Sequence, residues 1–268
     1  MVKMSKLDMT ESGEMRTEFK DIIRLARSLD NSIESVESLY HYSLERLGID
    51  IPEEKEFQKN GVLIAFDGHS GAGKDTQIRL LENHMIGDER YIQNKIMTLV
   101  QKKNPFKQVS KYLWQHPESE IGNDSSLLLL TAGRKYFTYN DLSPSLELDD
   151  SIIILNRSYL SNLAYHASCP ERLPALMLLS YFDIPADIKL MLECDTAAAY
   201  TRIIARSLQK GGIIYPNEKP EYIDRVKKNF HELSKFVDGM IFIDSSGRQD
   251  EVSKHICSIV DDYFKEKR

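Results

Sequence analysis

The stretch that decides the fold is Gly61–Leu81, which reads GVLIAFDGHSGAGKDTQIRLL. Its apolar start, Val62–Phe66, is typical of a buried strand, and the spacing of Ile78 and Leu81 is typical of a helix. Between them, Gly68–Lys74 reads G-x-x-x-x-G-K in the strand–loop–helix context that a phosphate-binding loop requires. Glycines let several backbone N–H groups point at phosphate oxygens, and the helix N-terminus adds its positive dipole. The stretch therefore predicts a site for nucleotide phosphates.

The loop has one unusual position, directly after its lysine. A Ser or Thr normally stands there as a ligand of Mg²⁺, but this chain has Asp75. A carboxylate binds Mg²⁺ well, and an acid is also favoured in the first turn of a helix, so both interpretations stay open. His69 is equally open between contact with substrate and filling the loop, whereas the Lys74 ammonium is expected at the β- and γ-phosphates. The loop residues expected to bind ATP with its Mg²⁺ are Gly68, Ser70, Gly71, Ala72, Gly73, Lys74, Asp75 and Thr76.

Short apolar segments alternate with helical stretches along the rest of the chain. That alternation predicts an α/β fold, a parallel five-stranded sheet with helices on both faces. The segment Gln209–Pro220 is rich in glycine, proline and polar residues, and it is expected to be a loop of a length that is usually functional. The predicted strands are Val62–Phe66, Lys95–Val100, Ser151–Leu155, Asp187–Leu192 and Met240–Ile243.

Residues 1–58 have a different pattern. Apolar residues recur at helical spacing in Phe19–Leu29 and again in Ile33–Leu47, with a helix stop and a helix cap at Asp30–Ser32. The pattern predicts a helical hairpin, an N-terminal extension to the domain over residues 59–268 that carries the phosphate-binding loop.

Composition excludes several classes of protein. The chain has 268 residues with 35 Lys and Arg against 41 Asp and Glu, so a broad basic face for nucleic acid is not expected. No apolar run approaches the roughly 18 residues of a membrane helix, and no membrane partner is expected. The 3 cysteines are too widely spaced for a metal cluster or a disulfide framework, which favours the cytoplasm as location.

Three arginines stand where a phosphoryl transfer would need them. Asn156 and Arg157 follow the third predicted strand, and parallel sheets bind ligands at the carboxyl ends of their strands. A planar guanidinium matches phosphate oxygens, so Arg157 is expected to hold an acceptor phosphate; the alternative is a surface salt bridge at the strand end. Arg202 and Arg206 share one face of a helix that enters the loop. Arg206 would supply charge to the transferring group and Arg202 would contact the donor; the alternative is a solvated basic face.

Around these positions the sequence resembles the thymidylate kinase family of nucleoside monophosphate kinases, over about residues 61–260. That family follows its third strand with Asp-Arg and a helix reading S-x-x-A-Y, which Arg157, Ser161, Ala164 and Tyr165 match. The other matching segments are Leu127–Arg134, Tyr222–Val226, Asn229–Phe230 and Ile243–Ser246.

The resemblance implies a reaction and an acceptor site. ATP would phosphorylate a nucleoside monophosphate, thymidylate in the first place, to the diphosphate. Arg134 and Asn162 would face the base, and Phe106 or Phe137 would either stack on the base or fill the core. Tyr165 would either lie near the sugar and disfavour a 2′-hydroxyl or pack as a half-buried helix tyrosine with its hydroxyl in water. Nucleotides are then the expected partners, and a homodimer is compatible with the hairpin as a brace.

The departures from the family pattern keep other readings open. Ser70 replaces an acid, Asn156 replaces the strand-end Asp, and Gln101–Phe106 stands where the family has R-E-P-G-G. We hypothesise that Asp75 supplies the charge that Asn156 lacks, and that both side chains bind Mg²⁺. The acceptor could instead be another nucleotide, a nucleoside or polyphosphate. A catalytically impaired regulatory protein, with the hairpin as its partner-binding part, is the third alternative.

Overall fold

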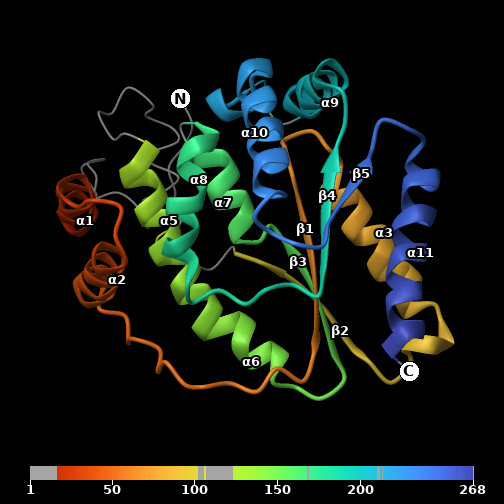
Figure 1. The fold of residues 1–268 in the computed structure, drawn as a ribbon, viewed down its shortest axis with the longest axis horizontal. Helices are drawn as coiled ribbons and strands as arrows, with labels where there is room; N and C mark the ends of the chain where they lie inside the picture. The colour runs from red at the N-terminus through yellow and green to blue at the C-terminus, as the bar shows by residue number, and fades with distance from the viewer. Residues whose placement is uncertain are drawn as a thin grey trace.

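A five-stranded sheet forms the centre of the chain (Figure 1). The computed structural model describes residues 17–101, 106, 123–167, 169–209, 212 and 214–267. The strands are β1 (Val62–Gly68), β2 (Lys95–Val100), β3 (Ser151–Asn156), β4 (Ile188–Glu193) and β5 (Met240–Asp244). They lie in the order β2-β3-β1-β4-β5, and every neighbouring pair is parallel. All five predicted strands are therefore present, and the predicted α/β fold is confirmed.

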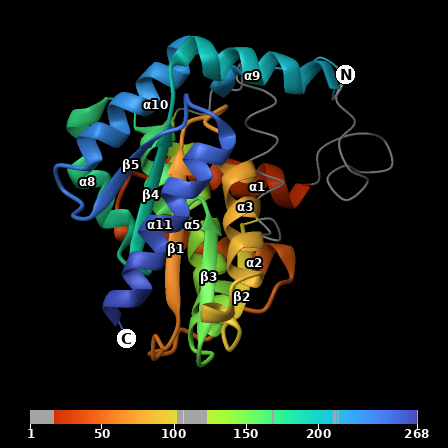
Figure 2. The ribbon, with the colours of Figure 1, turned by 90° about the vertical axis from the view of Figure 1, so that its right-hand side faces the viewer.

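Helices cover both faces of the sheet, as predicted. One face carries α3 (Lys74–Ile86) and α11 (Gln249–Lys267), and the other carries α5 (Asn123–Phe137), α7 (Tyr159–His166) and α10 (Pro220–Leu233), as Figures 1 and 2 show. Among the described residues outside the N-terminal region, the other α-helices are α6 (Ser143–Leu146), α8 (Leu173–Met177) and α9 (Thr196–Gln209). Short helical turns are Glu89–Tyr91, the π-helical Thr138–Leu142, Pro170–Arg172, Leu178–Ser180 and Pro216–Glu218.

The central strand β1 shows why the sheet needs both layers. Its side chains alternate between the two faces, because successive residues of a strand point to opposite sides. Leu63 and Ala65 join the apolar core on the side of α6, whereas Ile64 and Phe66 join the core formed with α3 and α11. All four are buried. A strand that is apolar on both faces must be covered on both faces, and this explains its unbroken apolar sequence.

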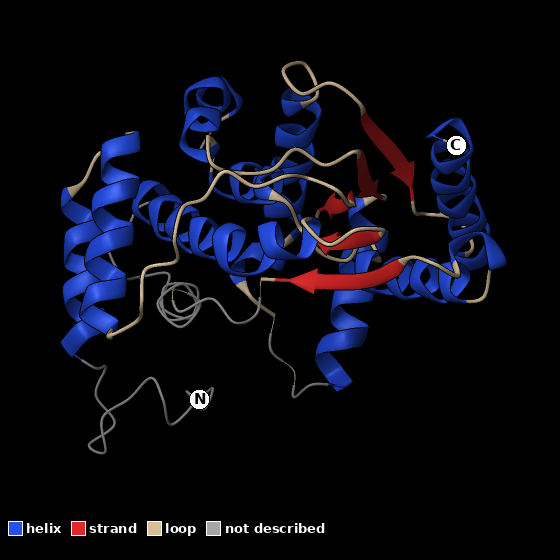
Figure 3. Cartoon of the chain, turned by 90° about the horizontal axis from the view of Figure 1, so that it is seen from below, coloured by secondary structure: helices blue, strands red, loops and turns tan. Residues whose placement is uncertain are grey.

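The predicted helical hairpin is present as α1 (Thr17–Ser28) and α2 (Ile33–Leu47). Ser32 caps α2 by accepting a hydrogen bond from the Ser35 N–H, and Gly48 ends it in the left-handed conformation with φ 65°. The hairpin forms a further layer outside α5 (Figure 3). Its buried residues share one apolar core with α5, so the extension is packed onto the part of the chain that carries the sheet.

The carboxyl ends of all five strands meet at one edge of the sheet, because the strands are parallel. The phosphate-binding loop follows β1, Arg157 follows β3, and Ser245 follows β5. This edge is the position where α/β sheets bind ligands. In the described part of the chain, no helix has both the length and the apolar character needed to cross a membrane.

Candidate active site

A cavity of about 950 Å³ opens at this edge of the sheet. We call the part at the loop and α3 the donor side, and the part at α5 and α7 the acceptor side. Gly68 and Arg134 are absent from the lining, although the Gly68 carbonyl accepts hydrogen bonds from the lining residues Lys74 and Arg157. The predicted site residues that line the cavity are Ser70, Gly71, Ala72, Gly73, Lys74, Asp75, Thr76, Asn156, Arg157, Asn162, Tyr165, Arg202 and Arg206.

Two glycines of the loop occupy positions where a side chain would collide with backbone. Gly68 has φ 132°, and a Cβ there would lie 2.0 Å from the carbonyl oxygen of Leu192. Gly71 has φ 80°, and its Cβ would lie 2.5 Å from the carbonyl oxygen of Ala199. L-residues rarely adopt such φ values. The loop is therefore pressed against β4 and α9, and this close approach gives the phosphate cradle its curvature.

Lys74 is fixed inside the loop. Its ammonium donates hydrogen bonds to the carbonyl oxygens of Gly68 at 2.9 Å and His69 at 2.8 Å. Burial, followed by the positive charge of Arg157, lowers the pKa of Lys74 well below its usual value. A phosphate would restore the favourable environment of the charged form, so the site is built to receive an anion.

His69 fills the loop from within. The backbone N–H of Cys194 donates to its Nε2 at 3.1 Å, so the ring proton lies on Nδ1, which donates to the carbonyl of Ser70 at 2.8 Å. The ring is buried, and burial lowers the pKa of His69 to about 4. Of the two interpretations left open by the sequence, the structure supports loop filling: a neutral imidazole ties the loop to the end of β4.

Arg157 lies at the centre of the acceptor side, in a left-handed backbone conformation with φ 75°. Its N–H donates to the carbonyl of Phe66 at 2.9 Å. Its guanidinium donates to the carbonyl of Gly68 and to the hydroxyl of Tyr165, both at 3.2 Å, and lies 4.8 Å from the centre of that ring. The predicted neighbours Arg157 and Tyr165 are thus in direct contact beside the phosphate-binding loop.

Asp67 is a functional candidate that the sequence analysis missed. Its fully buried carboxylate accepts hydrogen bonds from the N–H of Ser158 at 3.0 Å, from the Ser158 hydroxyl at 2.6 Å and from the hydroxyl of Ser161. These contacts fix the start of α7 to the end of β1. The available signal was an acid between the predicted apolar strand Val62–Phe66 and the first loop glycine.

The two predicted metal ligands lie together. The side-chain amide of Asn156 donates to a carboxylate oxygen of Asp75 at 2.8 Å, across the gap between β3 and α3. The amide oxygen of Asn156 and the carboxylate of Asp75 are hard oxygen donors of the kind that Mg²⁺ binds. The donor set therefore fits the predicted metal.

Arg134 requires a correction, because the structure does not place it in the cavity. Its side chain is 1% exposed and forms a two-pronged ion pair with the fully buried Asp183, at 2.9 and 3.0 Å. A third donor, Nη1, bonds the carbonyl of Arg157 at 3.2 Å. The guanidinium is paired with a carboxylate 49 residues away in the chain. It therefore lies behind Arg157 instead of facing a base. Phe106 and Phe137 are also buried in apolar cores and do not line the cavity.

Arg202 and Arg206, the two predicted arginines on α9, have different partners. Arg202 donates to the carbonyl of Gly71 at 3.3 Å and to that of Ser245 at 2.9 Å, so it joins the loop to the segment after β5. Arg206 is paired with the carboxylate of Glu218, which also accepts a hydrogen bond from the Tyr215 N–H. The expected loop contains a short helical turn at Pro216–Glu218, and residues 210, 211 and 213 of this loop lie outside the described part of the chain.

The far end of the acceptor side contains residues that the sequence analysis did not select. Gln101, Leu130 and His166 line the cavity together with the predicted Asn162. Burial lowers the pKa of His166 to about 4, so its imidazole is neutral at physiological pH. The available hydrogen-bonding groups at this end are therefore uncharged amides and an imidazole.

A phosphate-binding loop on a five-stranded parallel sheet, with arginines converging on it, defines the class of phosphotransferases built on this loop. A family model described as thymidylate kinase matches residues 66–256. The chain belongs to the thymidylate kinase family, as predicted, and is an enzyme of the nucleoside monophosphate kinase type.

Individual relatives agree with this assignment. The chain is 27% identical to a thymidylate kinase of Dictyostelium discoideum, over 80% of this chain and 90% of that protein. It is also 27% identical to one of Francisella tularensis, over 75% and 96%. A solved thymidylate kinase structure from Candida albicans shares the fold, with TM-score 0.59 and 19% identity over 76% of this chain and 92% of that chain.

Proposed function

We propose that this protein transfers the γ-phosphoryl group of ATP to the phosphate of thymidylate. One observation carries the proposal: the Lys74 ammonium and the Arg157 guanidinium both donate to the same carbonyl oxygen, that of Gly68, at 2.9 and 3.2 Å. Lys74 belongs to the donor side and Arg157 to the acceptor side. Two cations that meet at one point can hold two phosphates end to end, which is the arrangement that phosphoryl transfer demands.

The donor would bind along the loop and the start of α3. Loop N–H groups and Lys74 would hold the β- and γ-phosphates, and Arg202 would stabilise the loop from α9. The segment after β5, with Ser245 and Gly247 in the cavity wall, lies beside the loop and would receive the nucleoside part of ATP.

Asp75 and Asn156 would hold Mg²⁺. When bound, the ion would neutralise negative charge on the phosphate oxygens. Compared with the family pattern, the carboxylate stands at the start of the helix instead of at the strand end. The donor set still contains one charged and one neutral oxygen ligand. The contact between the two side chains supports this exchange of positions.

The acceptor would bind with its phosphate on Arg157 and its sugar beside Tyr165. A tyrosine face pressed against the sugar leaves little room for a 2′-hydroxyl. Asn162 and Gln101 would offer amide donors and acceptors to the edge of the base. The absence of Arg134 from the cavity favours a second candidate, a related nucleoside monophosphate as acceptor, since no cation from α5 is available to select the thymine oxygen.

Transfer would be completed by Arg206. Its guanidinium is held by Glu218 at the mouth of the cavity. An incoming triphosphate would compete for it, because a phosphate offers more negative charge than one carboxylate. Arg206 would then stabilise charge on the transferring group.

The three cysteines, Cys169, Cys194 and Cys257, are unpaired, and the proposed location is the cytoplasm, where thiols stay reduced. Whether two copies associate is a separate proposal, which sedimentation would test.

A coupled assay of ADP release over all nucleoside monophosphates tests the reaction. We expect turnover with thymidylate, and lower turnover in the Lys74→Ala variant because that variant binds ATP more weakly. Turnover on a different monophosphate would support the second candidate. Tight ATP binding without turnover on any acceptor would contradict the proposal and support a regulatory nucleotide-binding protein.

A further inference from the structure

We propose that the N-terminal hairpin positions Arg157 for the acceptor, through the adjacent α5 residues Lys135 and Arg134. The inference rests on the proposed role of Arg157 as the ligand of the acceptor phosphate. It gives the hairpin a function in the reaction that neither the phosphate-binding loop nor membership of the family assigns to it.

Lys135 is the point where the hairpin is attached. Its side chain is 1% exposed, and its ammonium pairs with Glu37 of α2 and with Glu54, at 2.7 Å, in the segment that follows the hairpin. The rings of Tyr40 and Tyr139 lie 5.0 and 5.8 Å from the ammonium. A buried ammonium is tolerated only when its charge is paired. The hairpin and its linker therefore supply the counter-charges that a residue of α5 requires.

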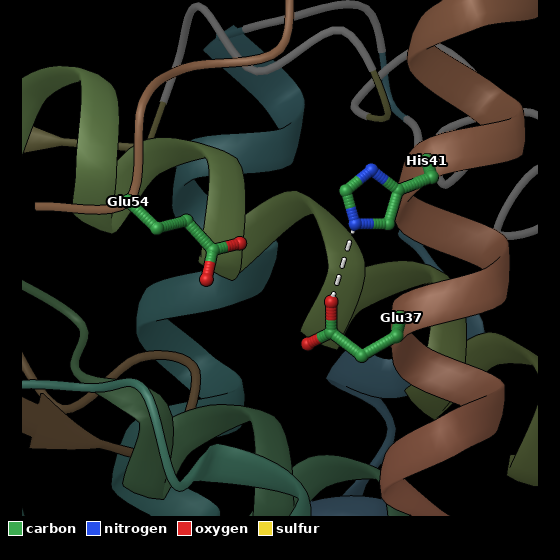
Figure 4. Close-up of side chains that lie close together, drawn as sticks. All are labelled: Glu37, His41 and Glu54. Atoms are coloured by element: carbon green, nitrogen blue, oxygen red, sulfur yellow. Dashed lines mark ion pairs between the residues drawn. The ribbon is translucent and has the colours of Figure 1, made fainter.

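The carboxylates around Lys135 also lie near His41 (Figure 4), with 3.4 Å between the His41 imidazole and Glu37. Glu37, His41 and Glu54 have ligand atoms within 4.8 Å of one another, as a metal site would. Both carboxylates already pair with the Lys135 ammonium. The cation of this cluster is thus supplied by the protein, and the cluster acts in docking the hairpin.

Arg134, the neighbour of Lys135 in α5, makes its contacts on the side of the active site and not with the hairpin. It pairs with Asp183 and donates to the carbonyl of Arg157 at 3.2 Å. Asp183 also accepts a hydrogen bond from the Thr138 hydroxyl at 3.3 Å. The Arg157 peptide is therefore held on both sides, by Phe66 at its N–H and by Arg134 at its carbonyl.

The contacts of Lys135 with the hairpin and of Arg134 with Arg157 are linked through one short turn at residues 181–183. Tyr181 bonds Glu37 and, at 3.2 Å, Lys135, whereas Asp183 bonds Arg134. Lys135 and Arg134, which are adjacent in α5, thus bind Tyr181 and Asp183 of the same turn. Glu37 of the hairpin pairs with both Lys135 and Tyr181 and so completes the first of these two contacts. A non-glycine residue with φ 75° is strained and persists only where its surroundings hold it. Loss of the contacts of Lys135 would let α5 shift away from this turn, and the backbone of Arg157 would then relax.

A double-mutant cycle on the full chain tests this coupling. Lys135→Met keeps the length and the helix propensity of the side chain but removes the charge that binds the hairpin. It is combined with Arg157→Lys, and KM for thymidylate and for ATP is measured in all four proteins. Arg46→Gln is the matched control, because it breaks an ion pair of 2.7 Å with Asp21 that lies entirely within the hairpin. If Lys135→Met does not fold, Glu37→Gln replaces it, since Lys135 then keeps Glu54.

We expect Lys135→Met to raise KM for thymidylate about tenfold, as a displaced substrate ligand does, and to change KM for ATP less than about twofold. In the Arg157→Lys background the same change should have almost no further effect, because residues that act through one group are not additive. Arg46→Gln should leave both constants unchanged. Equal effects on both substrates, or effects that multiply in the double variant, would overturn the inference. If Arg157→Lys alone leaves KM for thymidylate unchanged, the proposed role of Arg157 fails instead.

Discussion

The donor side and the acceptor side of the cavity are built in different ways. The donor side is one continuous segment, in which β1, the loop and α3 follow each other directly in the chain. The acceptor side depends on residues far apart in the chain: Arg157 follows β3 and lines the cavity, and behind it Arg134 of α5 pairs with Asp183 of the turn before β4 and binds the Arg157 carbonyl. A local segment can be predicted from its own sequence, whereas an assembled site depends on which partners the fold brings together.

The largest expected effect of a single substitution lies where the two sides meet. Arg206→Ala should lower kcat about 10³-fold, the lower end of what an arginine on a transferring phosphoryl group contributes. ATP affinity should change little, because the contact forms mainly in the transition state. Single-turnover kinetics and nucleotide titration measure the two quantities. Arg24→Ala, an exposed arginine of the hairpin, is the control; normal turnover of Arg206→Ala would remove this residue from the mechanism.

Lys74→Ala should act on the donor side alone. A charge-assisted hydrogen bond contributes roughly 1.5–3 kcal/mol, so ATP affinity should fall at least about tenfold. Calorimetric titration with ATP and, separately, with thymidylate would show the asymmetry. Unaltered ATP affinity would contradict the assignment of the loop.

Asp75→Ala tests whether the metal site belongs to the donor side. Loss of the carboxylate leaves Asn156 as the single predicted ligand, and the Mg²⁺ concentration for half-maximal activity should rise about tenfold. Asp75→Asn, which keeps the shape and the contact to Asn156, should show the same shift if the charge is what matters. An unchanged Mg²⁺ dependence would show that Asp75 only complements the helix dipole.

The smallest effect concerns pH. His69 has a pKa of about 4 in the folded chain against an ordinary value near 6.5, so below about pH 6.5 the unfolded chain binds a proton that the folded chain does not. The folded state therefore loses stability as pH falls from 6.5 towards 4, by about 1 kcal/mol near pH 5.5. Urea unfolding at several pH values would measure it. His69→Gln, which keeps a donor and an acceptor without titrating, should have a flatter profile; an identical profile would assign the effect elsewhere.

Much of the fold was predictable because its signals are local. The central strands β1 and β3 are apolar on both faces, and the cap at Ser32 and the stop at Gly48 define the second hairpin helix within a few residues. The strand-end position of Arg157 was also predictable, because parallel strands share one functional edge.

The remaining features were not predictable, since each depends on a distant partner. Arg134 matches the family pattern in sequence, but the carboxylate of Asp183 withdraws its guanidinium from the cavity. The role of His69 is decided by the backbone of Cys194, and that of Lys135 by two acids of the N-terminal region. Spacing within a segment carries no information on these tertiary contacts.

The central claim is that Arg157 holds the acceptor while the loop holds the donor. Steady-state kinetics of Arg157→Lys, with ATP and thymidylate both varied, test it most directly. Lysine keeps the charge but loses the planar fork, so KM for thymidylate should rise roughly tenfold while KM for ATP stays within about twofold. A rise confined to ATP would place Arg157 on the donor side and contradict the account.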